Sequence, residues 1–486
     1  MSRFPLETTA PGGAGSLDDQ TQAPPVLAFA TLASRSQPHR AGEVAFLPYE
    51  ETLFIGRGDE PVAEFVRFSR RRPGETLAAD PHEDLLLGKT MSRRQLVVRA
   101  NAVAVDVENV GRCEMLVNGV ETKSASVKPG DTVRLRGEHL FLCIRRPMEL
   151  PHPGGFVQAF GEPDLAGIIG ESAVAWLLRH QLAVAARSSD HVMIQGLSGS
   201  GKELAARAIH LGSDRAKGPF VSRNVANITR SILQSELFGN NKNYPNPGMP
   251  ARDGVVGAAD GGSLLLDEIG DCPLEIQVSL MRLLDSGEYD PVGEGTSRRA
   301  DLRIIGATNR DNSAFKSDLL ARFLTRVLIP PLRERREDIP LLVRHWLLDR
   351  ARKNPEEAGR FIEAGPSGRP EPRVSSRLLE YLVRQPLPLN VRELNGLLVL
   401  AIRAGASNGD TVNIPSLPDL PAAETPESAA AGAAPEAQGN AKPREWTKEE
   451  IVDRLEREGG NITRAAAALG LDRSTLRGRM KRYGIK

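Results

Sequence analysis

The chain has 486 residues, which is too long for one ordinary domain and suggests about three. Its composition, 40% hydrophobic and 26% charged, is typical of a folded globular protein and excludes a low-complexity or fibrous chain. Because the 63 basic residues and 62 acidic residues nearly cancel, the net charge by itself points to no class of partner.

The three cysteines, Cys113, Cys143 and Cys272, are scattered without Cys-x-x-Cys spacing. This argues against a disulfide framework or a structural zinc site. No apolar run approaches the length of a membrane span, and the Pro/Gly-rich residues 1–25 do not resemble a signal peptide. We therefore expect a cytoplasmic protein with no membrane partner.

The first part of the chain predicts a disordered leader followed by a β-sandwich. Residues 1–25 form the leader, and residues 26–146 contain short alternating or β-branched runs, as at 52–55, 103–107 and 140–144. Turn signals such as Asn118-Gly119 separate these runs. Many short strands at this spacing are typical of an all-β sandwich.

The middle and last parts predict a different architecture. From residue 156, helical periodicity alternates with buried-strand runs, as at 262–266 and 302–306, which is typical of an α/β domain with a parallel sheet. We place its core at 156–345 and a helical lid at 346–410. An Ala/Pro/Glu-rich tract predicts a flexible linker at 411–443, and residues 444–486 are helical in pattern. The predicted fold class is thus multidomain: all-β, then α/β with a lid, then α-helical.

A glycine-rich loop lies between the strand-like run 192–194 and the helix-like run 204–210. Its glycines let successive N–H groups point at a phosphate, and the N-terminus of the following helix adds positive potential. Lys202 would reach the β- and γ-phosphates as a point charge. The spacing predicts a nucleotide-binding loop that consists of Gly196, Leu197, Ser198, Gly199, Ser200, Gly201, Lys202 and Glu203.

An acid pair follows the apolar strand run 264–266. Asp267 would hold Mg²⁺, and Glu268 would orient and activate the attacking water. At this distance after a phosphate-binding loop, the pair favours nucleotide hydrolysis over a surface acidic turn. We therefore expect ATP and Mg²⁺ as cofactors, and no further metal because the eight histidines show no ligand spacing.

These motifs belong to a longer ordered series. Taken together, the series resembles the AAA+ domain of bacterial enhancer-binding proteins, the sigma-54 activators. The segments that carry the resemblance are Gly196–Glu203, Pro219–Val221 with Asn224, Ser235–Gly239, Ala259–Gly262, Leu266–Gly270, Ala307–Arg310 and Pro331–Arg335.

The resemblance implies roles for individual residues. Glu203 stands where this family commonly has Glu, which supports the assignment of the phosphate-binding loop. Asn224 matches the residue that pairs with the catalytic glutamate, here Glu268. Asn309 lies in the sensor I stretch, and Arg392 matches the sensor II arginine.

The family works as a ring, usually hexameric, because arginines of one subunit complete the neighbour's site. Arg322 matches one of two such finger positions, whereas the other is occupied by Lys316. An arginine finger stabilises charge on the transferring phosphoryl group. Lysine lacks the planar bidentate fork, so Lys316 predicts weaker activation of the neighbour; the alternative is that it is only a solvated surface residue.

The loop that touches sigma-54 in this family differs here. Activators carry a Gly-Ala-Phe-Thr-Gly-Ala loop after the Ser235–Gly239 motif, whereas this chain has Asn243–Gly248, with prolines at 245 and 247. Proline fixes φ and stiffens a loop that must move with nucleotide state. The change argues against a contact with sigma-54, although Tyr244 is available for another partner.

The N-terminal sandwich resembles a forkhead-associated domain, through Ile55–Arg57, Ser92–Gln95 and Asn118-Gly119. That resemblance implies a partner carrying phosphothreonine, with Arg57 and Ser92 binding the phosphate. Gln95 replaces the usual histidine, and Arg112–Glu114 replaces the peptide-reading Thr-Asn-Gly loop. The alternative is a sandwich that only packs or oligomerises.

The C-terminal segment resembles a Fis-type helix-turn-helix. A helix of small residues, 465–469, is followed by a glycine turn and a second helix that Asp472 would cap. Basic residues on that second helix are typical of a helix that enters the major groove. Since Fis-type pairs dimerise, inverted-repeat DNA sites are expected. The expected DNA contacts are Arg473, Ser474, Thr475, Arg477, Arg479, Lys481 and Arg482.

The sequence leaves more than one function open. The first hypothesis is an ATP-hydrolysing transcriptional regulator of the sigma-54 activator type with an altered contact loop. The second is a nucleotide-switched DNA-binding regulator that does not remodel sigma-54, which the 243–248 stretch favours. A third is an AAA+ assembly factor or chaperone tethered to DNA.

Overall fold

The computed structural model describes most of the chain. The described residues are 25–58, 62–73, 84–152, 154–155, 158–244, 247–248, 250–293, 295–365, 368–404, 411–413, Ile451, Val452, Leu476 and Met480. The chain separates into two compact units, Met1–Ala423 and Glu424–Lys486. Apart from their last or first residues, the predicted leader and linker lie outside the described residues.

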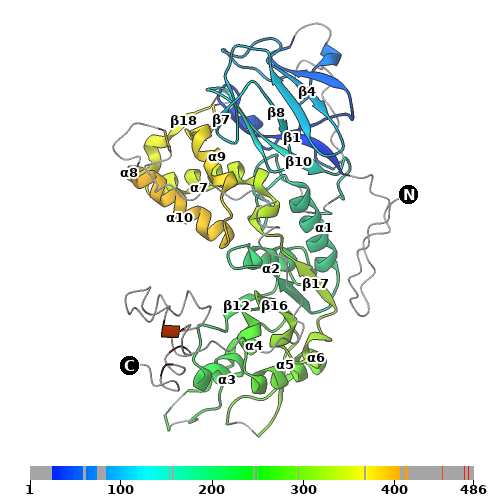
Figure 1. Ribbon diagram of the computed structural model, residues 1–486. Helices are drawn as coiled ribbons and strands as arrows, with labels where there is room; N and C mark the ends of the chain where they lie inside the picture. The colour runs from blue at the N-terminus through cyan, green and yellow to red at the C-terminus, as the bar shows by residue number, and fades with distance from the viewer. Residues whose placement is uncertain are drawn as a thin grey trace, which may run out of the picture. The chain divides into compact units, whose positions relative to one another are not determined.

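Two antiparallel sheets form the N-terminal sandwich (Figure 1). The six-stranded sheet has the order β2-β1-β10-β9-β6-β7, made of β1 (Val26–Ser34), β2 (Val44–Phe46), β6 (Met115–Val117), β7 (Val120–Glu121), β9 (Thr132–Leu135) and β10 (His139–Arg146). The four-stranded sheet has the order β3-β4-β5-β8, made of β3 (Thr52–Ile55), β4 (Leu96–Ala100), β5 (Val105–Asn109) and β8 (Ser124–Val127). Alternate residues such as Phe29 and Phe141 fill the core between the sheets.

A five-stranded parallel sheet with the order β12-β13-β16-β11-β17 forms the centre of the α/β region. Its strands are β11 (Val192–Gln195), β12 (Phe220–Asn224), β13 (Ser263–Asp267), β16 (Arg303–Thr308) and β17 (Thr325–Leu328). The helices are α1 (Ala173–Arg187), α2 (Lys202–Leu211), α3 (Arg230–Phe238), α4 (Gly254–Ala258), α5 (Leu274–Ser286) and α6 (Ser317–Leu320), and β14 (Glu288–Tyr289) pairs with β15 (Arg298–Arg299).

Both faces of this sheet are buried, as the apolar strand runs predicted. Leu265 on β13 packs with α1 and α2 on one face. Its neighbours Leu264 and Leu266 pack with α3 and α5 on the other face. Successive strand side chains point to opposite faces, so a strand covered on both sides is apolar at nearly every position.

The lid contains α7 (Ile339–Lys353), α8 (Pro355–Ala358), α9 (Ser376–Arg384) and α10 (Asn390–Ala404), with the small hairpin β18 (Ile362–Ala364) and β19 (Pro370–Pro372). Its first helix therefore begins at Ile339, before the predicted start of the lid at residue 346. Helix α9 begins after Ser375, whose hydroxyl accepts a hydrogen bond from Leu378 N at 3.2 Å.

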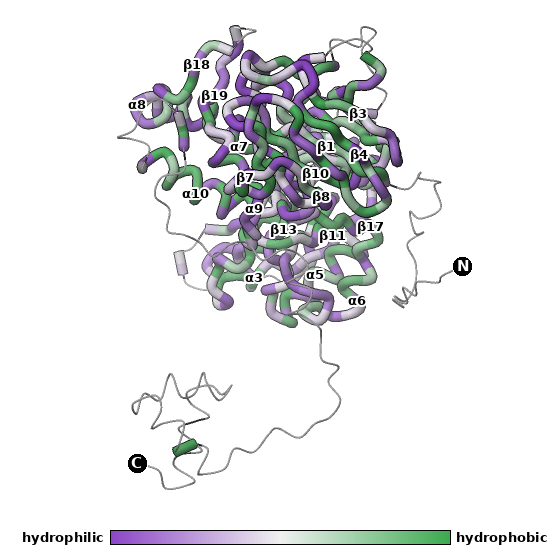
Figure 2. The backbone as a smooth tube through the Cα atoms, turned by 45° about the horizontal axis from the view of Figure 1, so that its top comes forward, coloured by the Kyte–Doolittle hydropathy of each residue, from purple (hydrophilic) through white to green (hydrophobic). Residues whose placement is uncertain are grey.

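The lid and the sandwich share one hydrophobic core, which the sequence analysis did not anticipate. Strands β1 and β10 are largely hydrophobic (Figure 2), and α7, α9 and α10 are grouped beside them (Figure 1). Residues 147–155 therefore separate the sandwich from the α/β region in the sequence, but the sandwich is not a separately packed domain.

In the described residues, no helix is long and apolar enough to cross a membrane.

Candidate nucleotide site

The carboxyl ends of the parallel strands gather the predicted site residues at one edge of the α/β sheet. The phosphate-binding loop follows β11, and Asp267 ends β13. Strand β16 lies between those two strands, so Asn309 comes between the loop and the acid pair. Ligands of open α/β sheets bind at this edge.

The phosphate-binding loop has the backbone that its glycines allow. Gly199 has φ +72° and Gly201 has φ +107°, a region that residues with a Cβ rarely adopt. A Cβ on Gly199 would also lie 2.3 Å from the carbonyl oxygen of Leu389 in the lid. Helix α2 begins at Lys202, so its free N–H groups face the loop.

Lys202 and Glu268 are in contact across this edge. Lys202 Nζ lies 3.2 Å from Gly196 O and 3.5 Å from Glu268 Oε1. The other carboxylate oxygen, Glu268 Oε2, accepts a hydrogen bond from Asn309 N at 3.2 Å. Glu268 itself has φ +53°, so its side chain is aimed from a left-handed backbone position.

Asn224 has a different partner from the one that the resemblance implied. Its Nδ2 donates to Asp267 Oδ2 at 3.0 Å, and no bond from it to Glu268 is present. Strands β12 and β13 pair in register with Asn224 opposite Asp267, which places the two side chains together. Asn224 is thus paired with Asp267 in this structure, and its pairing with Glu268 stays a prediction.

The first residues of α10 contact the phosphate-binding loop directly. Asn390 Nδ2 donates to Ser198 O at 2.9 Å, and Val391 N donates to Gly199 O at 3.2 Å. Arg392 Nη1 donates to Ser198 Oγ at 2.8 Å. The predicted sensor II arginine thus lies at the loop.

The motifs in the sequence did not identify two further residues of this site, Asn390 and Arg335. Asn390 has φ +54° and accepts a hydrogen bond from Leu332 N at 2.7 Å, so it ties the lid to the segment that enters it. The buried Arg335 donates from Nη2 to Ser200 O at 3.0 Å. Arg335 closes the Pro331–Arg335 motif, which carried part of the resemblance, and Asn390 precedes the predicted sensor II residue Arg392 by two positions.

Arg322 lies away from the loop and is held within its own subunit. Its Nε and Nη2 donate to the two carboxylate oxygens of Asp285, each at 2.7 Å. This bidentate pairing lowers the pKa of Asp285 below its usual value. Lys316 is half-buried, and its backbone N donates to Gln277 Oε1 at 3.0 Å. Asp285 has no motif around it, which is why the sequence did not indicate this pair.

The arrangement fits a magnesium nucleotide. The hydroxyl of Ser200 and the Oδ1 of Asn224 are buried and have no hydrogen-bond partner among the described residues. A polar ligand would satisfy such atoms. In the described part of the chain, no group of three or more His, Cys, Asp or Glu residues forms a metal site by itself. Mg²⁺ would therefore depend on Asp267 together with phosphate oxygens and water.

The altered loop after the Ser235–Gly239 motif is closed at its base. Asn240 and Arg252 exchange backbone hydrogen bonds of 3.0 Å in both directions. The buried side-chain nitrogen of Asn240 lies within hydrogen-bond distance of the carbonyls of Asn241, Tyr244 and Pro250. We call residues 240–252 the contact loop.

The contact loop is also joined to the loop between β14 and β15. Asn241 N donates to Val292 O at 3.0 Å. The side chain of Tyr244 is 43% exposed, and its ring packs against Gly293. A Cβ atom at position 293 would lie only 2.4 Å from Tyr244 Cγ. Residues 245, 246 and 249 lie outside the described residues, so the predicted stiffening by Pro245 stays a prediction.

In the sandwich, the structure brings the two predicted phosphate-binding residues together. Arg57 N donates to Ser92 O at 3.2 Å, and Ser92 Oγ accepts from Arg112 N at 3.0 Å. The buried Gln95 holds this region, donating to Asn109 Oδ1 at 2.7 Å. Gln95, at the histidine position of the resemblance, therefore serves to hold the surrounding loops together by hydrogen bonds, one of which it accepts from Ser92 N at 3.0 Å.

Glu114, the acid in the peptide-reading position, is not a free charge. Arg136 Nε lies 2.6 Å from its carboxylate. A carboxylate paired with a guanidinium would repel a phosphate less than an unpaired one. Binding of phosphothreonine stays a prediction.

The predicted DNA-contacting residues 473–475, 477, 479, 481 and 482 lie outside the described residues. Leu476 and Met480, which are described, are helical and buried.

Comparison with known proteins gives two family matches. Residues 168–328 match the sigma-54 interaction domain. Residues 443–483 match the bacterial regulatory protein, Fis family.

Several curated relatives are similar over a large part of the chain. Regulatory protein AtoC of Escherichia coli is 36% identical over 62% of this chain, and the chain spans 64% of AtoC, just under two thirds. The DNA-binding transcriptional regulator NtrC of Klebsiella pneumoniae is 36% identical over 66% of this chain and 71% of its own length. A crystal structure of NtrX from Brucella abortus in complex with ADP is 30% identical over 66% of this chain and 70% of its own, with a TM-score of 0.46. The chain therefore belongs to the bacterial enhancer-binding proteins, the sigma-54 activators.

Proposed function

We propose that the protein hydrolyses ATP between neighbouring subunits of a homo-oligomeric ring, usually hexameric in this family, and thereby regulates transcription from DNA that its C-terminal helices bind. The observation that carries this proposal is the convergence at the phosphate-binding loop. Glu268, Arg335 and the start of α10 reach that loop from three separate parts of the chain.

The first step would be binding of ATP by the loop. The N–H groups at the start of α2 and the Lys202 ammonium would hold the phosphates. Phosphate oxygens would then compete with Glu268 for Lys202, from which Glu268 is only 3.5 Å away. The lid residues Asn390 and Arg392 would close over the same loop.

Hydrolysis would follow once Glu268 is released from Lys202. Glu268 would hold the attacking water and accept its proton as the water oxygen bonds to the γ-phosphorus. The bond from the γ-phosphorus to the bridging oxygen would break, which releases ADP and inorganic phosphate. Asn309 N would keep the Glu268 carboxylate oriented, as it does here at 3.2 Å. Mg²⁺ held by Asp267 would neutralise charge on the phosphates.

The ring would be needed because Arg322 does not face its own subunit's loop. In a ring it would have to leave Asp285 and reach the neighbour's γ-phosphate. The pair is partly exposed, so the exchange costs little. Lys316 would supply charge beside it without bidentate geometry.

The test is ATP-dependent open-complex formation by purified sigma-54 RNA polymerase on a promoter with upstream inverted repeats. We expect the wild type to open the promoter and Lys202→Ala to fail, because the variant lacks the phosphate-binding ammonium. The variant must still bind the DNA site, which controls for folding. Wild-type ATPase activity without promoter opening would contradict remodelling of sigma-54.

A second candidate function has its own supporting observation. The contact loop lacks the Phe-Thr tip and is held at its base by Asn240 and on one side by the Gly293 loop. A nucleotide-switched DNA-binding regulator needs assembly and site occupancy but no mobile contact loop. This function predicts that ATP changes DNA occupancy in footprinting while the promoter stays closed.

We also propose that the sandwich edge at Arg57 and Ser92 binds a phosphothreonine peptide. The backbone hydrogen bond from the exposed Arg57 to the carbonyl of Ser92, which brings the two residues together, supports this. A phosphothreonine peptide library should bind the wild type and lose binding with Arg57→Ala. Equal binding of the unphosphorylated library would favour a sandwich that only packs.

A further inference from the structure

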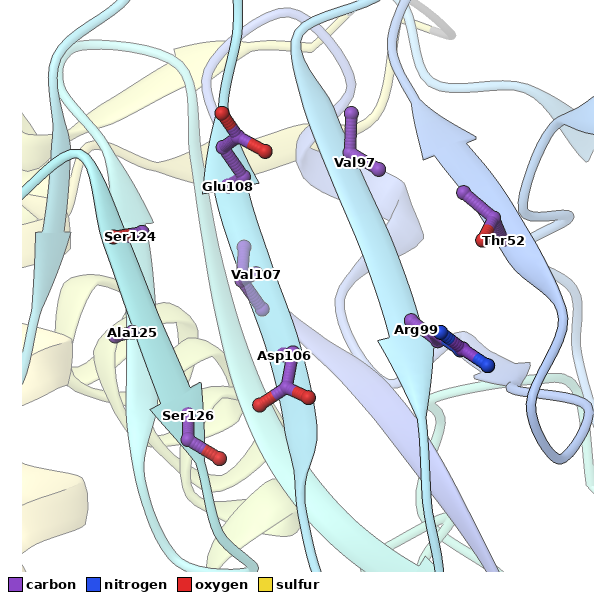
Figure 3. A pocket seen from close by; sticks show the side chains of 9 residues that line it. All are labelled: Thr52, Val97, Arg99, Asp106, Val107, Glu108, Ser124, Ala125 and Ser126. Carbon is purple, nitrogen blue, oxygen red and sulfur yellow. The ribbon is translucent and has the colours of Figure 1, made fainter.

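The two outer faces of the sandwich differ in chemistry. On the four-stranded sheet, Arg99, Asp106 and Glu108 project outward and are exposed (Figure 3). On the six-stranded sheet, the outward residues of β1, β2 and β10 form a mainly aliphatic, buried face: Ala28, Ala30, Leu32, Val44, Leu140, Leu142 and Ile144. Phe46 on the same face is partly buried, and Arg146 at the end of β10 is buried. An independent sandwich would carry polar residues on both outer faces.

The lid covers that aliphatic face. The residues that pack in the same core come from three lid helices: Val343 and Leu347 of α7, Leu378 and Leu382 of α9, and Leu394 and Leu398 of α10. All are almost fully buried. Separation of the two parts would expose to water the apolar surfaces of this core that meet between the lid and the sandwich, which a folded protein in water avoids.

A buried polar cluster fixes the register of this contact. Glu380 of α9, 5% exposed, accepts from Thr132 Oγ1 at 2.9 Å and from Arg134 Nε at 2.8 Å. One turn further along the helix, Arg384 Nη1 donates to Asn118 O at 2.7 Å. Because a buried charge is stable only when it is paired, Glu380 has few alternative positions on β9.

The same core reaches the nucleotide site through α10. Leu394 and Leu398 pack in it, and the first turn of this helix carries Asn390 and Arg392 against Ser198. Helix α10 is thus a rigid connection between the shared core and the phosphate-binding loop. A shift of the core against the sandwich would therefore move the residues that close on the phosphate-binding loop.

We propose that the sandwich is a fixed part of the lid and that Glu380 is a positioning residue, which sets where α10 places Asn390 and Arg392 over the phosphate-binding loop. The role of Glu380 rests on the proposed nucleotide binding. The fixed attachment of the sandwich does not, because it follows from the shared core alone. The two parts are therefore tested separately.

The attachment is tested by cutting the full-length chain. A protease site inserted after Met148, which is 57% exposed, allows cleavage between the sandwich and the rest. We expect the two fragments to elute together from a sizing column at low micromolar concentration and to separate only in denaturant. Elution as separate species in native buffer would overturn the proposal.

The positioning role is tested with Glu380→Gln in the full-length chain. This variant leaves the Arg134 charge buried without a counter-charge, so we expect the Kd for MgADP to rise by about 5-fold or more, the lower range of ordinary coupling. The KM for ATP should rise with it, while kcat at saturating ATP changes by less than about 2-fold. The double variant Arg134→Gln with Glu380→Gln removes both charges and should restore nucleotide affinity.

Glu357→Gln is the matched control. Glu357 is paired with Arg350 inside the lid and is outside the core shared with the sandwich, so its loss should leave the Kd unchanged. If Glu380→Gln does not fold, Thr132→Ala removes one of the two hydrogen bonds and should give a smaller rise. Unchanged affinity in both variants would overturn the positioning role, whereas absence of nucleotide binding in the wild type would instead refute the proposed function.

Discussion

The nucleotide site and the contact loop differ in how far their residues agree with the family resemblance. The nucleotide site combines residues that follow β11, β13 and β16 with residues of the lid, and its residue types are those that the family resemblance implies, except at Lys316. The contact loop is closed at its base by Asn240 and Arg252, and it lacks the Phe-Thr pair that the family resemblance leads us to expect at its tip. Many partners constrain a residue in the nucleotide site, whereas the tip of a surface loop is constrained only by what it binds.

Loss of the finger should give the largest effect and tests whether the nucleotide site is completed by a neighbour. We expect Arg322→Ala to lower kcat for ATP by about 10³-fold, because a finger stabilises the transferring phosphoryl group. Steady-state ATPase assays measure this. Asp285→Ala is the control, since it frees Arg322 without removing it and should not lower kcat. Wild-type turnover by Arg322→Ala would place the finger elsewhere.

Glu268→Gln should have the next largest effect, on hydrolysis and not on binding. The amide keeps the shape and the bond from Asn309 N but cannot accept the proton of water, so kcat should fall by about 10²-fold or more. Calorimetry with ATP should show retained binding. Mixing these subunits with Arg322→Ala subunits should restore part of the turnover, and normal turnover by Glu268→Gln alone would refute its role as the base.

Asn240→Ala probes the base of the contact loop. Three carbonyls near its amide would lose their donor, so the free energy of unfolding should fall by about 1–3 kcal/mol. Chemical denaturation measures the change, and amide exchange should rise in residues 241–252. Asn241→Ala, which removes only an exposed contact to Lys242 N, should change stability by less than about 0.5 kcal/mol. Equal stability of Asn240→Ala and the wild type would show that the loop is not held this way.

Gly293→Ala should have the smallest effect on stability. It tests only the contact between Tyr244 of the contact loop and the loop that carries Gly293. Gly293 has φ +79°, and a methyl group there would meet the Tyr244 ring, so we expect about 1–2 kcal/mol lower stability and greater exposure of Tyr244. Tyrosine fluorescence quenching reports the exposure. Gly295→Ala is the control, because nothing lies within 4 Å of its Cβ position. Unchanged quenching would mean that the two loops are independent.

The parts of the site that were predictable are those whose chemistry depends on the local backbone. A phosphate-binding loop needs glycines at fixed positions, so Gly199 and Gly201 could be identified from spacing. The partner of Asn224 could not, because it depends on the register in which β12 meets β13. The pair of Arg322 with Asp285 joins a loop and a helix that no motif connects.

The sheets of the fold were also predictable from the sequence, but the packing between the sandwich and the lid was not. Strand periodicity predicted a sandwich and a parallel sheet, and both are present. The continuous apolar character of β1 and β10 was a signal that both of their faces are covered, but it does not name what covers them.

The sequence by itself determined the order of the domains, the phosphate-binding loop, the acid pair and the change in the contact loop. Each of these is encoded in a short stretch whose residue types the chemistry prescribes. Only the tertiary structure decided that the lid packs on the sandwich, that Glu380 is paired with Arg134 and that α10 carries this contact to the loop. Burial is a property of surfaces that meet in space, and those surfaces come from residues more than two hundred positions apart in the chain.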